Sequence, residues 1–150
     1  MKDILSNKYL VLISRLILGY VFIYAGMEKI IDPAGFAESI LNYKLTPIFL
    51  VNLFAIIIPW TETVAGLFLV FGFSSKESSF IIGALLIVFN VMVTIAVIRG
   101  LDIECGCFGT NDSQTVGIQK LLENFVLLLF SIQIILFDKN EFSLKPNSIK

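Results

Sequence analysis

Residues 80–98 read FIIGALLIVFNVMVTIAVI, a run of nineteen residues without one charged side chain. About 20 apolar residues in a helix cross the hydrocarbon core of a bilayer, which is about 30 Å thick. Because unpaired backbone groups are costly in lipid, such a segment crosses the membrane as a helix. Three more stretches are long and apolar enough to do the same, at residues 9–27, 48–73 and 121–137. The sequence therefore predicts an all-α membrane protein in which four transmembrane helices form a bundle.

The composition of the whole chain agrees with this fold class. Of its 150 residues, 57% are hydrophobic and 15% are charged, a mixture too apolar for one water-facing domain. Eleven Lys and Arg residues against twelve Asp and Glu residues give a formal charge of -1, which excludes the basic surface that binds nucleic acid. Histidine is absent, which excludes serine-histidine triads and histidine metal sites. We therefore expect the lipid bilayer, and no nucleic acid, among the partners of this protein.

The chain has the organisation of a single unit. No linker, internal repeat or low-complexity tract divides it, so we expect one membrane domain over residues 1–150. Residues 138–150 are polar and contain Pro146. We expect them to form a flexible tail.

A short amphipathic helix is expected after the first span, in the segment FAESILNYKL at residues 36–45. Asp32 is a residue type that caps helix starts, and Pro33 fits a first helical turn. The apolar face expected for this helix consists of Phe36, Ile40 and Tyr43, with Leu41 as a further candidate. Because such a face enters the boundary between headgroups and lipid chains, we predict an interfacial helix that lies on the membrane.

The orientation follows from the distribution of lysine and arginine. Four spans put both termini on one side of the membrane, together with the turn at residues 74–79. Six lysines lie on that side, namely Lys2, Lys8, Lys76, Lys139, Lys145 and Lys150. Four basic residues lie on the other side, namely Lys29, Lys44, Arg99 and Lys120. Since cytoplasmic segments carry the excess of positive charge, we predict cytoplasmic termini and an extracytoplasmic loop at residues 99–117.

Two ionisable residues, Arg15 and Glu62, lie well inside the predicted spans. An ionised group near the middle of a membrane helix costs about 2.5–3.5 kcal/mol and usually faces a partner inside the bundle. We therefore predict that Arg15 and Glu62 pair with each other, either as a structural ion pair or in a polar pocket for a substrate or a proton. Lys29 and Asn90 are further candidates for this pocket. Their alternative roles are interfacial anchoring for Lys29 and hydrogen bonding between helices for Asn90.

Cys105 and Cys107 are the two cysteines of the chain, in the segment ECGCFG at residues 104–109. Residues two apart can reach the Cα separation of about 4.4–6.8 Å that a disulfide requires, but the small ring is strained and easy to reduce. These features suit a redox-active pair. A structural disulfide stays an alternative, although so short a loop gains little chain entropy. Two thiolates without histidine make an incomplete zinc site, so we expect no resident metal, with transient copper(I) binding as the remaining alternative.

Three segments of the chain resemble known small membrane proteins. RLILGYVFIYAGMEKI at residues 15–30 and PWTETVAGLFLVFG at residues 59–72 resemble the DoxX-like superfamily of four-helix membrane proteins. The CxCFG element at residues 105–109 resembles the MauE branch of that superfamily, named for methylamine utilisation. Members of the branch are associated with thioredoxin-like partners and with disulfide formation in exported proteins. The resemblance covers nearly the whole chain and implies that Cys105 and Cys107 are the redox pair.

We therefore expect a thiol-disulfide oxidoreductase of the bacterial inner membrane. In this hypothesis Cys105 and Cys107 exchange electrons with an extracytoplasmic thioredoxin-like protein through a mixed disulfide. Other DoxX-like proteins are linked to quinone reduction, so a quinone held in the bundle is a candidate electron carrier, with Arg15 and Glu62 supplying charge and a proton route. Two alternatives belong to other classes of protein. One is a non-catalytic scaffold for a thioredoxin-like protein, and the other is a small-solute carrier that uses Arg15 and Glu62.

Overall fold

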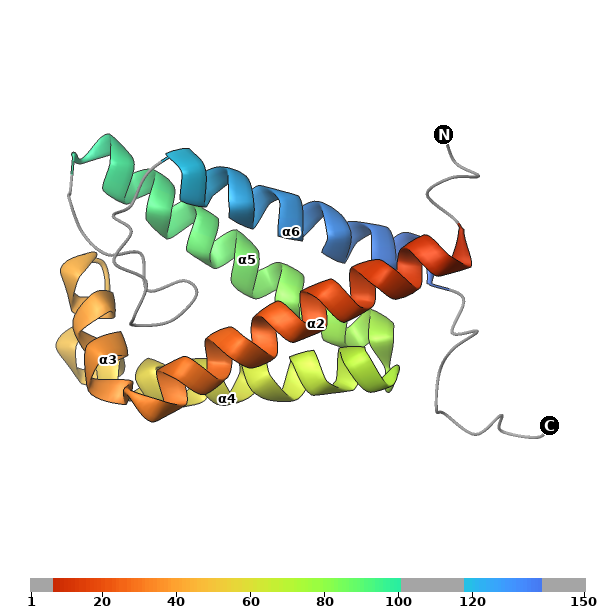
Figure 1. Cartoon of the computed structure of the whole chain (residues 1–150). Coiled ribbons are helices and arrows are strands. Elements are labelled where there is room, and N and C mark those ends of the chain that lie inside the picture. Colours follow the sequence, from red (N-terminus) through yellow and green to blue (C-terminus); the bar gives the residue numbers. More distant parts are fainter. Residues whose placement is uncertain (1–6, 101–117, 139–150) are drawn as a thin grey trace.

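The fold consists of helices. A computed structural model describes residues 7–100 and 118–138, and these two ranges contain five α-helices and no strand (Figure 1). The helices are α2 (Lys8–Ile31), α3 (Pro33–Asn42), α4 (Ile48–Phe71), α5 (Ser75–Ile98) and α6 (Ile118–Phe137). Four of them, α2, α4, α5 and α6, are long and apolar enough to cross a membrane. The prediction of an all-α membrane fold with four spans is confirmed.

The helices extend beyond the predicted spans where polar side chains are buried. α5 begins at Ser75, five residues before its predicted start. Ser75, Ser78 and Ser79 are buried in the bundle, so packing continues the helix into a segment that hydropathy alone does not mark. α2 continues four residues past its predicted end, through the buried side chain of Lys29.

The four long helices run alternately up and down the bundle. Figure 1 shows the start of α2, the turn from α4 to α5 and the end of α6 at one end, which we call the Lys8 end. The opposite end, which we call the α3 end, holds α3, the end of α5 and the start of α6. α2 packs against α4 and α6, and α5 packs against α6 and α4.

Glycines bring α2 and α4 into close contact. A Cβ atom at Gly19 would lie 2.9 Å from the carbonyl oxygen of Gly66, and one at Gly26 would lie 2.8 Å from the carbonyl oxygen of Pro59. Small residues allow membrane helices to approach this closely. These two contacts also fix how far the antiparallel helices are shifted along each other.

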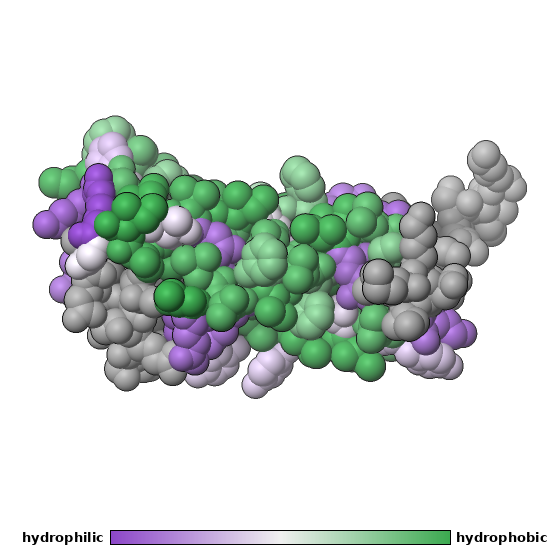
Figure 2. All heavy atoms as spheres, turned by 90° about the horizontal axis from the view of Figure 1, so that it is seen from above, coloured by the Kyte–Doolittle hydropathy of each residue, from purple (hydrophilic) through white to green (hydrophobic). Residues whose placement is uncertain are grey.

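The core of the bundle is apolar, and so is most of its outer surface. Leucine, isoleucine and phenylalanine side chains from all four long helices form the core, namely Leu18, Phe22, Leu69, Ile82, Leu86, Leu127 and Ile134. Figure 2 shows apolar atoms over much of the visible lateral face, with hydrophilic residues gathered mainly toward the ends. Such a wide apolar surface is unusual for a protein in water and fits contact with lipid.

The start of α3 follows the sequence prediction. The Asp32 carboxylate accepts a hydrogen bond from the backbone N–H of Gly35 at 2.9 Å, and Pro33 lies in the first turn. Asp32 also ends α2, because its backbone N–H donates to the carbonyl oxygen of Glu28. The same residue therefore closes α2 and caps the start of α3.

The short helix predicted after the first span is present as α3, but its apolar face packs against protein instead of entering the lipid boundary. Its buried side chains are Phe36, Ile40 and Tyr43. Phe36 and Ile40 form a cluster with Val51 and Ala55 of α4, whereas Leu41 is exposed. Only a few residues join α3 to α4, so α3 folds back on the start of α4. The apolar side chains of α3 are buried against α4 in this way.

Candidate functional site

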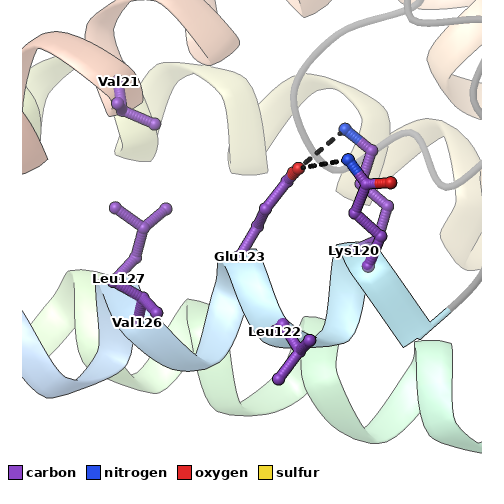
Figure 3. Close-up of a pocket in the computed structure, with 7 residues that line it drawn as sticks. Val21, Lys120, Leu122, Glu123, Val126 and Leu127 are labelled. Atoms are coloured by element: carbon purple, nitrogen blue, oxygen red, sulfur yellow. Dashed lines mark hydrogen bonds and ion pairs between the residues drawn. The ribbon is translucent and has the colours of Figure 1, made fainter.

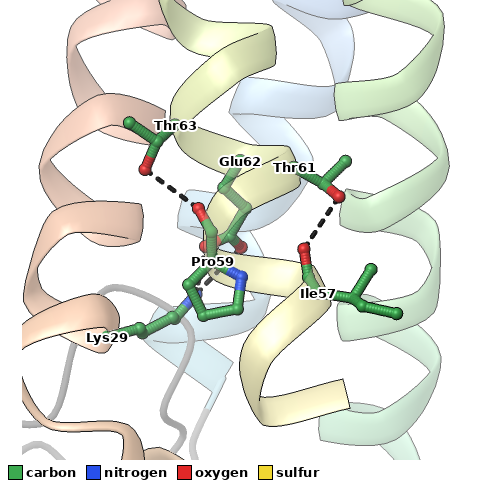
Figure 4. A network of polar contacts seen from close by, with 6 residues as sticks. All are labelled: Lys29, Ile57, Pro59, Thr61, Glu62 and Thr63. Carbon is green, nitrogen blue, oxygen red and sulfur yellow. Dashed lines mark hydrogen bonds and ion pairs between the residues drawn. The ribbon is translucent and has the colours of Figure 1, made fainter. Parts of the chain in front are cut away.

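Glu62 forms a buried ion pair with Lys29. The Lys29 Nζ atom donates hydrogen bonds to both carboxylate oxygens of Glu62, at 2.9 Å and 2.8 Å. Lys29 is 0% exposed and Glu62 is 1% exposed (Figure 4). A charge buried this deeply is costly unless an opposite charge and hydrogen bonds compensate it, and each residue supplies both to the other.

Two aromatic rings complete the surroundings of the Lys29 ammonium group. Its Nζ atom lies 5.0 Å from the ring centroid of Phe36 and 4.9 Å from that of Phe89. A cation at this distance from an aromatic ring is attracted by the negative charge of the ring face. Lys29 on α2 therefore contacts α3 through Phe36, α4 through Glu62 and α5 through Phe89.

The hydroxyl groups beside Glu62 bond within their own helix. Thr63 donates to the carbonyl oxygen of Pro59 at 2.9 Å, and Thr61 donates to that of Ile57 at 2.8 Å (Figure 4). Pro59 has no backbone N–H, so α4 lacks one of its regular hydrogen bonds in this turn. Both threonines satisfy their hydroxyl groups in this way without using the Glu62 carboxylate.

Arg15 does not pair with Glu62, and that prediction is wrong. Arg15 donates through Nε and Nη2 to the carbonyl oxygen of Leu69, at 3.3 Å and 3.2 Å. Its Nη1 atom lies 3.9 Å from the carboxylate of Asp138. Arg15 is too far from Glu62 to pair with it, because Gly26 of α2 is the residue that packs against the turn of α4 around Glu62. Gly26 follows Arg15 by eleven residues in α2, about 16 Å at a rise of about 1.5 Å per residue, which exceeds the reach of one side chain.

Asn90 of α5 and Asn124 of α6 lie at a similar height on two helices that pack against each other. Gly83 of α5 lies against Ser131 of α6, since a Cβ atom at Gly83 would lie 2.8 Å from the Ser131 Oγ atom. Asn90 follows Gly83 by seven residues and Asn124 precedes Ser131 by seven, which is about two helical turns in each antiparallel helix. The Oδ1 atom of Asn90 and both amide atoms of Asn124 are buried without a hydrogen-bond partner in the described part of the chain.

These residues lie at a similar depth in the bundle. Phe89, which contacts Lys29, directly precedes Asn90, and Asn124 lies at a similar height to Asn90 on the neighbouring helix α6. We call Lys29, Glu62, Asn90 and Asn124 the polar layer. Since each of the four long helices contributes one member, the polar layer crosses the bundle.

A second buried lysine lies on α6, nearer the start of that helix. Lys120 donates to the Glu123 carboxylate at 3.2 Å, and Gln119 donates to the same carboxylate at 3.3 Å. This cluster lines a groove with a volume of about 590 Å³, together with Val21 of α2 and Leu127 of α6. Figure 3 shows these side chains. Lys120 is one helical turn from Asn124, so it extends the polar surface of α6 toward the α3 end.

The structure brings together part of the predicted site. Lys29 and Glu62 bind each other, Asn90 lies in the same layer, and Arg15 contacts Leu69 and Asp138 near the Lys8 end. Sequence patterns did not assign a site role to Phe36, Phe89 or Asn124. Cys105 and Cys107 lie outside the described residues, as does the predicted tail after Asp138. The described residues that flank the cysteine segment are Gly100, just after α5, and Ile118, the first residue of α6.

Comparison with known proteins gives one family. The chain is 27% identical over 135 residues to Methylamine utilization protein MauE of Paracoccus denitrificans, covering 89% of this chain and 73% of that protein. It is 26% identical over 136 residues to Methylamine utilization protein MauE of Methylophilus methylotrophus, covering 89% of this chain and 72% of that protein. No solved structure matches the chain. The family model described as Methylamine utilisation protein MauE matches residues 7–137, most of the sequence, and the chain therefore belongs to the MauE family.

Proposed function

We propose that this protein is a thiol-disulfide oxidoreductase in which Cys105 and Cys107 exchange electrons with a thioredoxin-like extracytoplasmic protein. The observation that carries the proposal is that both anchors of the cysteine segment, Gly100 and Ile118, belong to the α3 end. Five residues of chain lead from Gly100 to Cys105, a reach of at most about 18 Å. Both ends of the cysteine segment are therefore held at the α3 end of the bundle.

The proposed reaction is an exchange of one disulfide for another. A thiolate of the reduced pair attacks the disulfide of the partner, forms a mixed disulfide and releases one partner thiolate. The second cysteine then attacks the mixed disulfide, which closes the Cys105–Cys107 bond and releases the second partner thiolate. Two electrons pass from the cysteine pair to the partner. The reverse sequence oxidises the partner, and the difference in reduction potential sets the direction.

The polar layer would serve this reaction by holding the α3 end of the bundle rigid. Lys29 contacts α3, α4 and α5 through one buried ammonium group. The cysteine segment begins just after α5, so the same contacts fix one of its two anchors. A rigid base favours a strained cysteine pair, because the strain persists only where the surrounding structure resists relaxation.

The proposed location is the bacterial cytoplasmic membrane, with both termini in the cytoplasm and the α3 end outside. The lysine distribution along the sequence supports this orientation. An extracytoplasmic position also suits a disulfide, since disulfides persist in oxidising compartments. The relatives are named for methylamine utilisation, and we propose that the exchange reaction serves that process here. The quinone suggested as an electron carrier stays a prediction.

The other two hypotheses have different support. The small-solute carrier required Arg15 and Glu62 in one pocket, and since Arg15 instead binds Leu69 and Asp138, no observation favours that carrier. The scaffold hypothesis requires the surface of the loop but not its thiols. Replacement of both cysteines therefore separates the scaffold from the oxidoreductase.

The redox state of the two thiols tests the proposal. Membranes are treated with a thiol-reactive polyethylene glycol, with and without prior reduction, and the number of added groups is read on a gel. We expect the protein to pass between forms with two and with no reactive thiols when an oxidised or reduced thioredoxin-like protein is added. Thiols that stay unchanged under both treatments would contradict the proposal, as would full function in a Cys105→Ser, Cys107→Ser double variant.

A further inference from the structure

We propose that a cavity beneath α3 binds one hydrocarbon chain of a bilayer lipid. The cavity has a volume of about 420 Å³ and lies between α3, α4 and α5. This volume is in the range of pockets that hold small molecules, about 300–1,000 Å³. The proposal stands on the shape and chemistry of this cavity and does not depend on the reaction of the cysteines.

The lining of the cavity is suited to hydrocarbon. Its walls are mostly aliphatic and aromatic, and the lining residues within 7–100 and 118–138 include no Asp, Glu, Lys or Arg. Among the polar lining residues, Ser39 donates its hydroxyl to the carbonyl oxygen of Gly35 at 3.0 Å, and Thr61 donates to that of Ile57. Burial raises the pKa of Tyr43 to about 12, so its phenol is neutral at physiological pH. An ion or a strongly polar solute would lose its hydration here without compensation.

The cavity is continuous with the surface that faces lipid. Phe54 and Ile57 of α4 and Val88 of α5 line it, and all three side chains are also exposed on the outside of membrane-spanning helices. We infer that a molecule dissolved in the bilayer can reach the cavity from the lipid-facing side of α4 and α5. Lipid chains are the most abundant molecules of this kind in a membrane, which is why we assign the cavity to a lipid chain.

The polar residues of the lining indicate how the lipid lies. Ser39, Tyr43 and Thr46 belong to α3 and to the connection that follows it, at the α3 end of the bundle, whereas the hydroxyl of Thr61 is bonded within α4. Leu85 belongs to the middle of α5, deeper in the membrane. The lipid headgroup would therefore lie at the α3 end with its chain extending toward Leu85. Transfer from lipid gains no hydrophobic free energy, so binding rests on van der Waals contacts that an empty cavity would lack.

The bound chain would also support the polar layer. Phe36 and Phe89 line the cavity, and the same two rings contact the ammonium group of Lys29. Filling the cavity holds both rings against Lys29. We therefore expect lipid removal to loosen the Lys29–Glu62 pair.

Photolabelling of the full-length protein tests the proposal. The protein is reconstituted in vesicles of phosphatidylcholine that carries a diazirine on one acyl chain, irradiated, and mapped by mass spectrometry. Leu85 and Leu128 are both partly buried against the same core, but only Leu85 lines the cavity. We expect at least about fivefold more label at Leu85 than at Leu128. Equal label at the two leucines, with strong label on exposed residues, would overturn the proposal.

A blocking variant gives a second, independent measurement. Leu85→Trp fills the cavity and should reduce label at Ile58 by at least about fivefold, because Ile58 lines the same cavity from α4. The matched control is Ile87→Trp, two residues along α5 at an exposed position outside the cavity, which should leave label at Ile58 unchanged. An equal loss of label in both variants would contradict the proposal. If Leu85→Trp does not fold, the Leu85 to Leu128 ratio in the natural sequence decides the question.

Discussion

Lys29 of α2 contacts α3, α4 and α5. Replacing it should lower the free energy of unfolding, because Glu62 would then be buried without a counter-charge. Lys29→Met leaves Glu62 buried without its cation, and Glu62→Gln leaves Lys29 without its carboxylate. Breaking a buried ion pair costs about 3–5 kcal/mol, whereas replacing both partners by neutral groups costs much less. We therefore expect each single variant to lower thermal stability in detergent strongly and the double variant to recover much of the loss.

The control for this cycle is Lys44→Met, which removes an exposed lysine outside the long helices. Its effect should stay within about 0.5 kcal/mol. Strictly additive losses for Lys29→Met and Glu62→Gln would contradict the pairing.

Sequence reasoning found the charged residues but not their partners. The depth of each charged residue in the membrane was counted from the end of its predicted span. This count placed Arg15 within reach of Glu62. The actual shift between α2 and α4 is set by Gly19 and Gly26 against α4, and hydropathy carries no information about that shift. Lys29 can reach Glu62 because it lies only one turn beyond Gly26.

At the scale of helices, α5 and α6 bury side-chain amide atoms of Asn90 and Asn124 where they pack together. These buried polar atoms lower the stability of the fold, so stability does not account for their presence. Asn124 has no hydrogen-bond partner in the described part of the chain, and an unsatisfied buried polar group costs about 1–3 kcal/mol. We expect Asn124→Leu, which keeps the number and branching of the side-chain heavy atoms, to raise thermal stability. If the polar layer serves the exchange reaction, the same variant should slow disulfide exchange with a thioredoxin-like substrate.

The comparison variant for Asn124 is Asn52→Leu, at an exposed position of α4. It should change neither stability nor exchange rate measurably. A loss of stability in Asn124→Leu would show that the amide is hydrogen-bonded in the membrane, and would contradict this account of the α5–α6 contact.

The contact of α2 with α4 should depend on small residues. Gly19→Leu places a side chain where a Cβ atom already lies 2.9 Å from the Gly66 carbonyl oxygen, so the helices must separate. Overpacking of this kind costs about 1–3 kcal/mol. The neighbouring Tyr20→Leu, on the exposed side of α2, should be nearly neutral, and thermal unfolding of the two variants measures the difference. Equal stability of both variants would contradict the close contact.

The helices themselves were largely predictable, and the surface against which α3 packs was not. Long apolar runs mark membrane helices because every other backbone conformation leaves polar groups unpaired in lipid. Asp32 and Pro33 marked the start of α3 by their capping chemistry. The apolar face of α3 was assigned to lipid because Phe36 and Ile40 form the same helical pattern whether they meet lipid or α4.

For the whole molecule, the proposed orientation makes a simple prediction about reporter fusions. Alkaline phosphatase is active only outside the cytoplasm. A fusion after Lys150 should therefore be inactive, whereas a fusion after Gly100, at the α3 end, should be active. A green fluorescent protein fusion at the same two positions gives the opposite signal and serves as the control. Strong phosphatase activity after Lys150 would reverse the orientation and put the cysteine segment in the cytoplasm.

The most direct test of the proposed function is the behaviour of the two single cysteine variants. In an exchanging pair one cysteine attacks and the other resolves the mixed disulfide. Removal of the resolving cysteine traps the partner, whereas removal of the attacking cysteine does not. We expect one of Cys105→Ser and Cys107→Ser to accumulate a mixed disulfide on non-reducing gels, with a thioredoxin-like protein identified in the adduct by mass spectrometry. The absence of any adduct in both variants, with unimpaired function of each, would contradict redox catalysis by this pair.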